Sequence, residues 1–496
     1  MLHHLPIPLY TAQQVRELDR IAIQDWGIPG IKLMKRAGYA VFQQLISRWP
    51  GAPITVFCGA GNNGGDGYIV AALAAEGRLP VRVIQVAPAD NLSGDARLAY
   101  EYAVQAGVTM APFTDCMNLQ TGVLVDALLG TGMSGPVREP FAQAIRLINH
   151  SGLPVVAVDI PSGLSSDTGM AANPTVMAEV TVSFIGLKQG LLTGEGRVYS
   201  GELVFSDLRL PEGIYHQLQP SGLRLELDDY LGLLPERRRD AHKGHFGHVL
   251  VIGGDLGYGG AVAMAGEAAL RSGAGLVSVA TRPEHVTALL SRRPELMVRG
   301  VTSGQQLRTL LEGASVLVVG PGLGKSPWSE QLLQQALAAG KPTVLDADGL
   351  NLLADSRLNS IPSDNWVLTP HPGEAARLLG TTVAAVQSDR FAAVRALHQK
   401  FKCPVLLKGA GSLICSADEL PVTVCCGGNP GMASGGMGDV LSGMIGGLLA
   451  QGLPADQALA LGVGLHAEAA DRAAVDGERG LLATDLFGPL RRLVNP

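Results

Sequence analysis

Near its C-terminus the chain reads Gly427-Gly428-Asn429-Pro430-Gly431-Met432-Ala433-Ser434-Gly435-Gly436-Met437-Gly438-Asp439. Small residues let backbone N–H groups approach a ligand closely. The apolar run Val440 to Ala450 follows and predicts a helix whose positive N-terminal end faces the loop. No Lys follows the glycines, so this is not a G-x-x-x-x-G-K-[ST] P-loop. An anion-binding loop beside the lone carboxylate of Asp439 favours phosphoryl transfer. The alternative is a flexible glycine loop that only caps a buried helix.

Composition limits the class of protein. The chain has 496 residues, 47% hydrophobic and 17% charged, which is typical of a globular protein of roughly two to four domains. A net charge of −6 gives no electrostatic basis for binding nucleic acid or anionic membranes. The six cysteines form no C-x-x-C pair, and neither a signal peptide nor an apolar run of the ~18 residues of a membrane helix is evident. We therefore expect a cytoplasmic protein with no nucleic-acid or membrane partner.

The order of apolar runs predicts two α/β blocks. In the first, Thr11 and Gln14 form a capping-box pattern, and a second helix is expected from about Lys32 to Trp49. Uniformly apolar strands joined by helices indicate parallel sheets covered on both faces. The expected strands of the first block are 54–58, 81–86, 123–128, 155–160 and 180–184, and those of the second are 248–252, 276–280, 316–319, 343–345, 367–369 and 405–407.

A less periodic stretch separates the blocks. It runs from about Pro211 to His242 and holds several prolines and the charge cluster 236–240, which we interpret as a solvated linker. We place the boundary near Pro220, giving domains 1–219 and 220–496. The two blocks differ in motifs and spacing, so we expect two unrelated domains and no repeat.

In the second block, polar or glycine-rich turns follow several strands, at the edge where open parallel sheets bind ligands. Lys408 ends a strand and precedes glycines, as a phosphate-neutralising lysine would, in the turn Lys408, Gly409, Ala410, Gly411 and Ser412. Glu374, in the turn His371, Pro372, Gly373 and Glu374, is a candidate to hold Mg²⁺ through water. Each turn alone is weak evidence, but together with the terminal G-x-G-D they favour a phosphate site.

The first block carries two glycine loops and two strand-ending carboxylates. One loop lies between a strand and a helix, a position that suits a dinucleotide phosphate, although the motif is not G-x-G-x-x-G. Asp126 and Asp159 each end an apolar strand, so they should meet at one sheet edge, although either is also compatible with a helix cap or turn. The loops comprise Asn62, Asn63, Gly64, Gly65, Asp66 and Gly67, and Gly130, Thr131, Gly132, Met133, Ser134, Gly135 and Pro136.

These motifs resemble two known families. The second block, with Lys243-Gly244, Thr369 to Glu374, Lys408 to Ser412 and Asn429 to Asp439, resembles the NAD(P)H-hydrate dehydratases, which are ribokinase-like. The first block, with 59–67, 126–132 and 159–163, resembles the NAD(P)H-hydrate epimerases. The likeness covers nearly the whole chain except the linker. It implies a Rossmann-like three-layer domain fused to a ribokinase-like α/β domain.

The resemblance also implies roles. Asp439 would be the base in the ADP-dependent dehydration of the S form of NADH or NADPH hydrate (NADHX or NADPHX). The hydrate itself would be contacted by Ala261, Gly322, His371, Pro372, Gly373 and Glu374. ADP is implied as donor, and sequence alone does not separate it from ATP. The nucleotide would be held by residues of the two glycine-rich loops: Lys408, Gly409, Ala410, Gly411, Ser412, Gly428, Asn429, Pro430, Gly431, Met432, Ala433, Ser434, Gly435, Gly436, Met437 and Gly438.

For the first domain the resemblance implies a K⁺ ion held by Asn63, Asp126 and Ser162, all of which offer oxygen as a hard cation requires. Asp159 is our choice for the proton transfer that interconverts the R and S hydrates, and the glycine-loop residues 62–66 and 130–136 would bind substrate. Lys188 is a secondary candidate, with a surface lysine as the alternative.

Two other functions remain open at this point. One is a ribokinase-like vitamin or sugar kinase that releases a stable phosphate ester. The other is a first domain that only binds a ligand and regulates the second.

We also expect a homo-oligomer, although the sequence does not fix the number of subunits.

Overall fold

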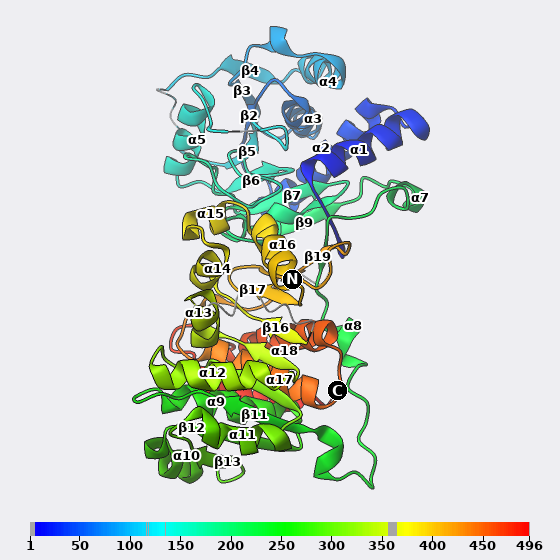
Figure 1. The fold of residues 1–496 in the computed structure, drawn as a ribbon. Helices are drawn as coiled ribbons and strands as arrows, with labels where there is room; N and C mark the ends of the chain where they lie inside the picture. The colour runs from blue at the N-terminus through cyan, green and yellow to red at the C-terminus, as the bar shows by residue number, and fades with distance from the viewer. Residues whose placement is uncertain (1–4, 116, 118, 134, 356–364, 496) are drawn as a thin grey trace. The chain divides into compact units, whose positions relative to one another are not determined.

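The computed structural model describes residues 5–495 except 116, 118, 134 and 356–364. The chain divides into two compact units, Met1–Arg224 and Leu225–Pro496. In each unit helices alternate with the strands of a largely parallel sheet, which confirms the predicted α/β class (Figure 1). Within the described ranges, no helix combines the length and the apolar character needed to cross a bilayer.

The first unit is built on one parallel sheet, in which every pairing between neighbours is parallel. The strand order is β4-β3-β2-β5-β6-β7-β9. The strands are β2 (Ile54–Cys58), β3 (Val81–Gln85), β4 (Thr109–Pro112), β5 (Val123–Ala127), β6 (Val155–Val158), β7 (Val180–Phe184) and β9 (Glu202–Ser206). Its central strands are buried along their whole length, which explains their unbroken apolar sequence.

Helices cover both faces of this sheet, because alternate strand residues feed two separate cores. Val56 and Val125 belong to the core on the side of α2 and α3, whereas Phe57 and Leu124 pack with α5. The sheet and its two helical faces form three layers (Figure 1). The helices are α1 (Ala12–Arg20), α2 (Gly30–Arg48), α3 (Asn62–Glu76), α4 (Gly94–Gln105), α5 (Phe141–His150), α6 (Gly196–Tyr199) and α7 (Glu212–Tyr215).

Three short strands complete the first unit. β1 (Pro8–Tyr10) pairs antiparallel with β10 (Gly222–Arg224) and parallel with β8 (Leu187–Lys188). The capping box predicted at Thr11 and Gln14 is confirmed at the start of α1. β8 carries Lys188 into the interior of the unit, where the side chain is completely buried.

The second unit has the strand order β13-β12-β11-β14-β15-β16-β17-β18-β19. The pairings from β13 to β17 are parallel, whereas β18 and β19 are antiparallel additions at one edge. The strands are β11 (His248–Ile252), β12 (Leu276–Thr281), β13 (Met297–Gly300), β14 (Val316–Val319), β15 (Thr343–Leu345), β16 (Trp366–Leu368), β17 (Val405–Leu407), β18 (Ser412–Cys415) and β19 (Val422–Cys425).

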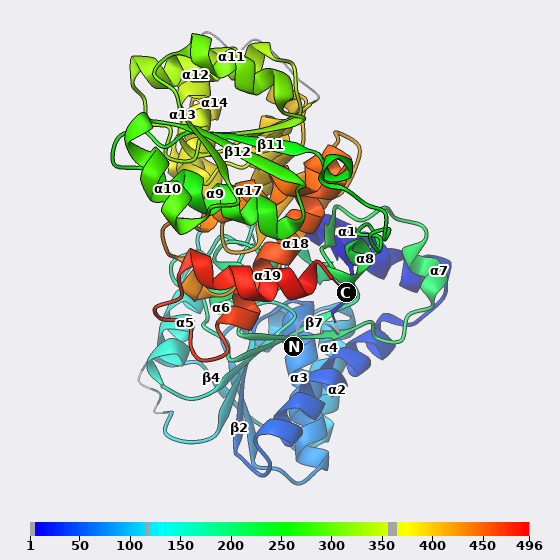
Figure 2. The same ribbon diagram turned by 90° about the horizontal axis from the view of Figure 1, so that it is seen from below.

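Its helices lie on the two faces of this sheet. α9, α17 and α18 form the larger core with Val249, Val251 and Val318, while α11 and α12 lie on the opposite face (Figure 2). The helices are α8 (Asp228–Leu231), α9 (Gly259–Ser272), α10 (Val286–Arg292), α11 (Gly304–Gly313), α12 (Pro327–Ala338), α13 (Ala347–Asp355), α14 (Pro372–Leu379), α15 (Val383–Ser388), α16 (Arg390–Phe401), α17 (Met437–Ala450), α18 (Ala455–Ala473) and α19 (Phe487–Leu493).

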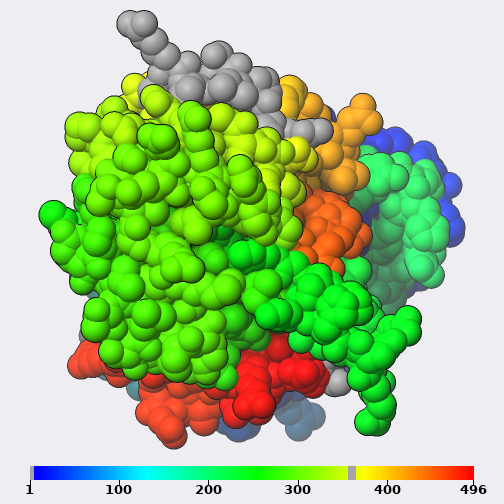
Figure 3. Space-filling view, turned by 60° about the horizontal axis from the view of Figure 1, so that its bottom comes forward, coloured from blue at the N-terminus to red at the C-terminus, as the bar shows by residue number. Residues whose placement is uncertain are grey.

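The charge cluster 236–240 lies between α8 and β11, where it forms neither helix nor strand and every residue is exposed. The green chain of this region stands out from the surface of the second unit (Figure 3). Arg238 pairs with Asp240 at 2.7 Å in full solvent, and such an exposed ion pair contributes little stability.

Candidate active sites

In the second unit, the loop of residues 427–436 leads directly into α17. The helix begins at Met437, three residues before the expected Val440, so Asp439 lies in its first turn. Gly436 caps the helix with φ 93°, a conformation that favours glycine. Asn429 accepts a hydrogen bond from Gly431 N (3.0 Å) and donates one to Asp471 (2.9 Å), which fixes the loop at its start.

Lys408 lies at the centre of a carboxylate cluster. Its Nζ is 2.7 Å from Asp346 Oδ1 and 4.0 Å from Glu374 Oε2. A Cβ atom at Gly438 would lie 3.2 Å from this Nζ, so the glycine lets the start of α17 approach the lysine. Lys408 follows β17 and Asp346 follows β15, so the parallel sheet brings these two charges together at one edge.

The carboxylates of this cluster are shifted towards neutral pH. Burial raises the pKa of Asp439 to about 7; Asp346 adds to the rise and Lys408 opposes it. Burial also raises the pKa of Glu374 to about 7, again against the effect of Lys408. Burial alone would lower the pKa of Lys408, but the charges of Asp346 and Glu374 raise it. The lysine therefore stays cationic, and Asp439 titrates in the range useful to a general base.

The turn after β16 starts α14 with a reciprocal cap. The backbone N–H of His371 donates to Glu374 Oε2 (2.8 Å), and His371 Nδ1 accepts from Gly373 N (3.0 Å). Burial, with Lys408, lowers the pKa of His371 and keeps its ring neutral. The turn after Lys408 is closed by Ser412, which accepts from Gly409 N at 3.2 Å.

Ala261 and Gly322 come from different turns but lie side by side. A Cβ at Gly322 would be 3.1 Å from the Cβ of Ala261. One turn further along α9, Met264 contacts Gly436 at the start of α17. The structure thus places both residues at the same edge as the glycine-rich loop 427–436. Asp346, the main partner of Lys408, was not among the predicted site residues, although it stands in a polar turn, Asp346-Ala347-Asp348, visible in the sequence.

In the first unit, Asn63, Asp126 and Ser162 gather around one point. Ser162 donates to Asp126 through Oγ (2.6 Å) and backbone N (2.7 Å), and Leu129 N donates to Ser162 Oγ (2.9 Å). Asn63 donates through Nδ2 to Leu129 O (3.1 Å), while its Oδ1 is buried and has no hydrogen-bond partner among the described residues. Burial raises the pKa of Asp126 to about 6, although hydrogen bonds from Ser162 and Leu128 N oppose the shift. The donor set is all oxygen, as a hard cation requires.

Asp159 follows β6 and forms an ion pair with Lys188. Its φ is 67°, so the strand ends at Val158 and not at Ile160 as expected. Lys188 also donates to Phe184 O (2.9 Å) and Ser183 Oγ (3.3 Å). The alternative of a surface lysine is therefore wrong: this cation is held inside the unit, against Asp159.

A cavity of 560 Å³ joins these groups. Its walls include Asp159, Lys188 and much of both glycine loops, in particular Asn62, Asn63, Asp66, Gly130, Thr131, Gly132 and Met133. Gly135 and Pro136 are exposed outside it, and Ser134 lies outside the described residues. Gly64 and Gly65 are buried in the first turns of α3, where a Cβ at Gly64 would overlap Gly59 O. Asp19 and Asp66 also line the cavity, and burial raises the pKa of both.

Comparison with known proteins assigns a family to each part of the chain. Residues 249–492 match the family described as NAD(P)H-hydrate dehydratase, and residues 30–190 match that described as YjeF-related protein N-terminus. A bifunctional NAD(P)H-hydrate repair enzyme of Coxiella burnetii is 50% identical over 98% of this chain and 99% of the relative. A second such enzyme, from Escherichia coli, is 44% identical over 99% of this chain and 95% of the relative.

The chain belongs to the family of bifunctional NAD(P)H-hydrate repair enzymes. The resemblance inferred from the motifs is confirmed, including the fusion of two domains in one chain. A solved structure of a ribokinase-like superfamily protein from Enterococcus faecalis is also similar, with a TM-score of 0.51 and 32% identity, over 55% of this chain and 95% of that one. The ribokinase-like class predicted for the second domain is therefore confirmed.

Proposed function

We propose that the second unit dehydrates the S form of NADH or NADPH hydrate at the expense of ADP, giving AMP and phosphate. The observation that carries this proposal is the position of Asp439, in the first turn of α17 between the anion-binding loop and Lys408. Residues 408–412 and 428–438 would hold the nucleotide, and ATP is the alternative donor. Ala261, Gly322 and the turn 371–374 would hold the hydrate.

The mechanism follows from this arrangement. Asp439 takes the proton of the hydrate hydroxyl, and the oxygen attacks the terminal phosphorus of ADP, whose bond to the bridging oxygen breaks to release AMP. Phosphate is a far better leaving group than hydroxide. The ring nitrogen donates its lone pair, the C–O bond breaks and phosphate departs with the bonding electrons. Loss of a proton from the adjacent ring carbon then restores the dihydropyridine.

Mg²⁺ is the cation proposed for this site. The carboxylate oxygens of Glu374 suit this hard ion, which usually retains water and binds together with substrate phosphates. Among the described residues, no preformed group of three or more His, Cys, Asp or Glu side chains is placed to hold a metal. Glu374 would therefore hold the ion through water, and the ion would offset charge on the phosphates.

We propose that the first unit interconverts the R and S hydrates. The hydrate carbon bears both nitrogen and hydroxyl, so hydroxide can leave and water can return on the other face. Asp159 would protonate the departing oxygen and deprotonate the returning water, and Lys188 fixes its position. Residues 62–66 and 130–136 would bind the substrate.

K⁺ is proposed to lie between Asn63, Asp126 and Ser162. The buried Oδ1 of Asn63, without a hydrogen-bond partner among the described residues, fits this assignment. The fully buried carboxyl of Asp126 would supply negative charge to the ion. The ion would order the loop that carries Leu129 and Gly130 along the cavity wall.

One experiment tests both activities. The protein is incubated with a mixture of R and S hydrates and ADP, and restored NADH is followed by absorbance while chromatography separates the epimers. We expect both epimers to disappear and AMP to form in step with NADH. Stable phosphate esters from hydroxymethylpyrimidine or sugars, without NADH formation, would instead favour the vitamin or sugar kinase.

Three further expectations accompany this function. We propose that residues 1–219 act as the epimerase domain and 220–496 as the dehydratase domain. A cytoplasmic location would place the protein with the nicotinamide cofactors that it repairs. A homo-oligomer remains our expectation, and light scattering of the full chain measures it.

A further inference from the structure

The turn between β11 and α9 presents an aromatic side chain that the proposed mechanism does not use. Tyr258 is 62% exposed, and its hydroxyl has no hydrogen-bond partner within the described part of the chain. Single exposed aromatic residues are common on protein surfaces, so exposure alone indicates no function. The position and rigidity of this residue provide the further evidence.

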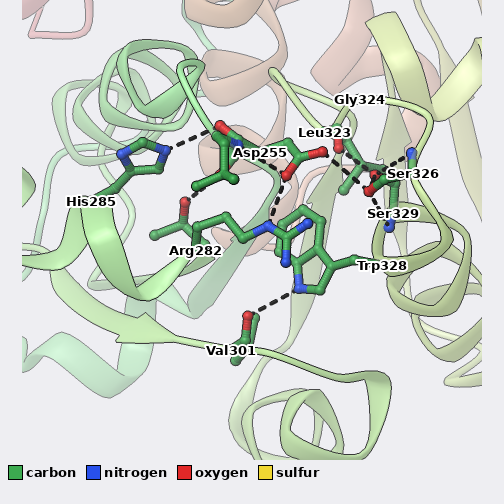
Figure 4. A network of polar contacts seen from close by, with 12 residues as sticks. Asp255, Arg282, His285, Val301, Leu323, Gly324, Ser326, Trp328 and Ser329 are labelled. Carbon is green, nitrogen blue, oxygen red and sulfur yellow. Dashed lines mark hydrogen bonds and ion pairs between the residues drawn. The ribbon is translucent and has the colours of Figure 1, made fainter.

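The turn is tied to its neighbours through Asp255. Its backbone N donates to Gly322 O (2.7 Å), and its backbone O accepts from Tyr258 N (2.8 Å). Its carboxylate accepts from Arg282 Nε (2.7 Å) and Ser326 Oγ (3.1 Å). Figure 4 shows these groups converging on Asp255 from the turns after β12 and β14.

A second layer of contacts supports this arrangement. The guanidinium of Arg282 lies 4.1 Å from the ring centre of Trp328, whose Nε1 donates to Val301 O at 3.0 Å (Figure 4). His285 Nε2 is 3.0 Å from Asp255 O. Side chains from two turns, Arg282 and His285 after β12 and Ser326 after β14, therefore hold the backbone segment that carries Tyr258.

Tyr258 adjoins the residues assigned to the hydrate. A Cβ at Gly322 would lie 2.8 Å from the Cβ of Tyr258, and Ala261 N donates to Tyr258 O at 3.2 Å. The flanking Gly257 and Gly260 have open space where a side chain would project. No neighbouring side chain therefore crowds the backbone on either side of the exposed tyrosine.

We propose that Tyr258 packs against the ring of the hydrate in the dehydratase site and that Asp255 is a positioning residue for this contact. The group recognised is the planar, conjugated part of a reduced nicotinamide ring, which offers one flat face to an aromatic side chain. This inference rests on the proposed dehydratase function and adds a residue that sets its substrate affinity.

The test measures the KM for the S hydrate and for ADP separately, in the full chain. Tyr258→Ala should raise the KM for the hydrate about tenfold, the size of a lost stacking contact, and leave the KM for ADP within about twofold. Tyr258→Phe keeps the ring and should behave as the parent protein does. Leu420→Ala is the matched control, because Leu420 is 56% exposed in the turn between β18 and β19, away from this edge.

A double-mutant cycle tests Asp255. Asp255→Asn should raise the KM for the hydrate in the parent background but add little to Tyr258→Ala, because the positioned ring is already gone. Fully additive effects would overturn the positioning role. An unchanged hydrate KM in Tyr258→Ala, or a rise confined to ADP, would overturn the ring contact. If the parent protein itself forms no NADH, the proposed dehydration is at fault instead.

Discussion

Replacing Asp439 by asparagine removes the proposed general base and leaves the proposed anion-binding loop unchanged, so the substitution tests the two roles separately. Asparagine has nearly the same shape but cannot accept the hydroxyl proton. Loss of a positioned general base typically costs ~10²–10⁴ in rate. We therefore expect dehydration by Asp439→Asn to fall by that factor, while nucleotide affinity changes little because the loop and Lys408 remain.

The raised pKa of Asp439 gives this prediction a pH signature. The carboxylate is the active form, so with a pKa of about 7 about a tenth is ionised at pH 6 and about nine-tenths at pH 8. The parent rate should rise through neutral pH and level off above it, and the residual rate of the variant should lack this rise. An acid whose pKa is raised by burial favours folding at low pH, and this contribution is lost as the pH rises through 7. At pH 8 the variant should therefore unfold at the parent's temperature or above it.

The assay follows absorbance of NADH restored from purified S hydrate with saturating ADP, and calorimetry measures nucleotide affinity. Asp456→Asn is the matched control, because Asp456 also lies in the first turn of a helix but is exposed. Turnover by Asp439→Asn near the parent rate would refute the assignment of the base. Loss of nucleotide binding to the same degree as turnover would show a role in the loop instead.

The other predictions concern the phosphate contact, the epimerase base and the proposed cation. Lys408→Ala should weaken nucleotide binding at least tenfold, because the variant leaves the charges of Asp346 and Glu374 uncompensated near the phosphates. Epimerisation should be unaffected, and an unchanged nucleotide affinity in calorimetry would contradict the proposed phosphate contact. Asp159→Ala should abolish the catalysed loss of the R hydrate, measured against a protein-free control for spontaneous epimerisation, and should leave dehydration of the S form intact. Loss of the R hydrate at the parent's rate would show that another residue transfers the proton, with Lys188 the next to test. K⁺ should raise the unfolding temperature of the parent more than Na⁺ does, and Asn63→Ala should remove that difference, because an ion that binds the folded state stabilises it.

The sequence predicted the central strands and the polar turns at their ends because these features are local. Val316–Val319 and Thr343–Leu345 are confirmed at the expected positions, since a fully buried parallel strand must be apolar throughout. The edge strands Thr109–Pro112 and Met297–Gly300 were not predicted. Both are partly or largely exposed, so their sequences lack a continuous apolar run.

The partners of the predicted site residues were harder to foresee. Asp346 and Lys408 are 62 residues apart, and only the order of strands in the sheet brings their side chains together. Asp471, which holds Asn429, lies on α18, 42 residues further along the chain, and no local pattern in the sequence indicates this pairing. The burial of Lys188 depends on the short strand β8, whose two residues carry no strand signal. Single residues of a site are thus visible in the sequence, whereas their pairing is a property of the fold.

The charge balance of the two sites explains why each is expected to need a different cation. In the second unit, Lys408 faces three carboxylates, those of Asp346, Glu374 and Asp439, and two of them have a pKa of about 7. Nucleotide phosphates add further negative charge, so a strongly charged ion such as Mg²⁺ is needed to bring donor and base together.

In the first unit, Asp159 already has its own lysine, and among the three residues proposed to hold the ion, Asn63, Asp126 and Ser162, only the buried Asp126 carries a carboxylate. One carboxylate among neutral oxygens matches a monovalent ion better than a divalent one, because it supplies only one negative charge in a buried site. Withdrawing Mg²⁺ should therefore stop dehydration and spare epimerisation, whereas exchanging K⁺ for Na⁺ should do the reverse. If a single cation supported both reactions equally, the two sites would not differ in the way that their charged groups indicate.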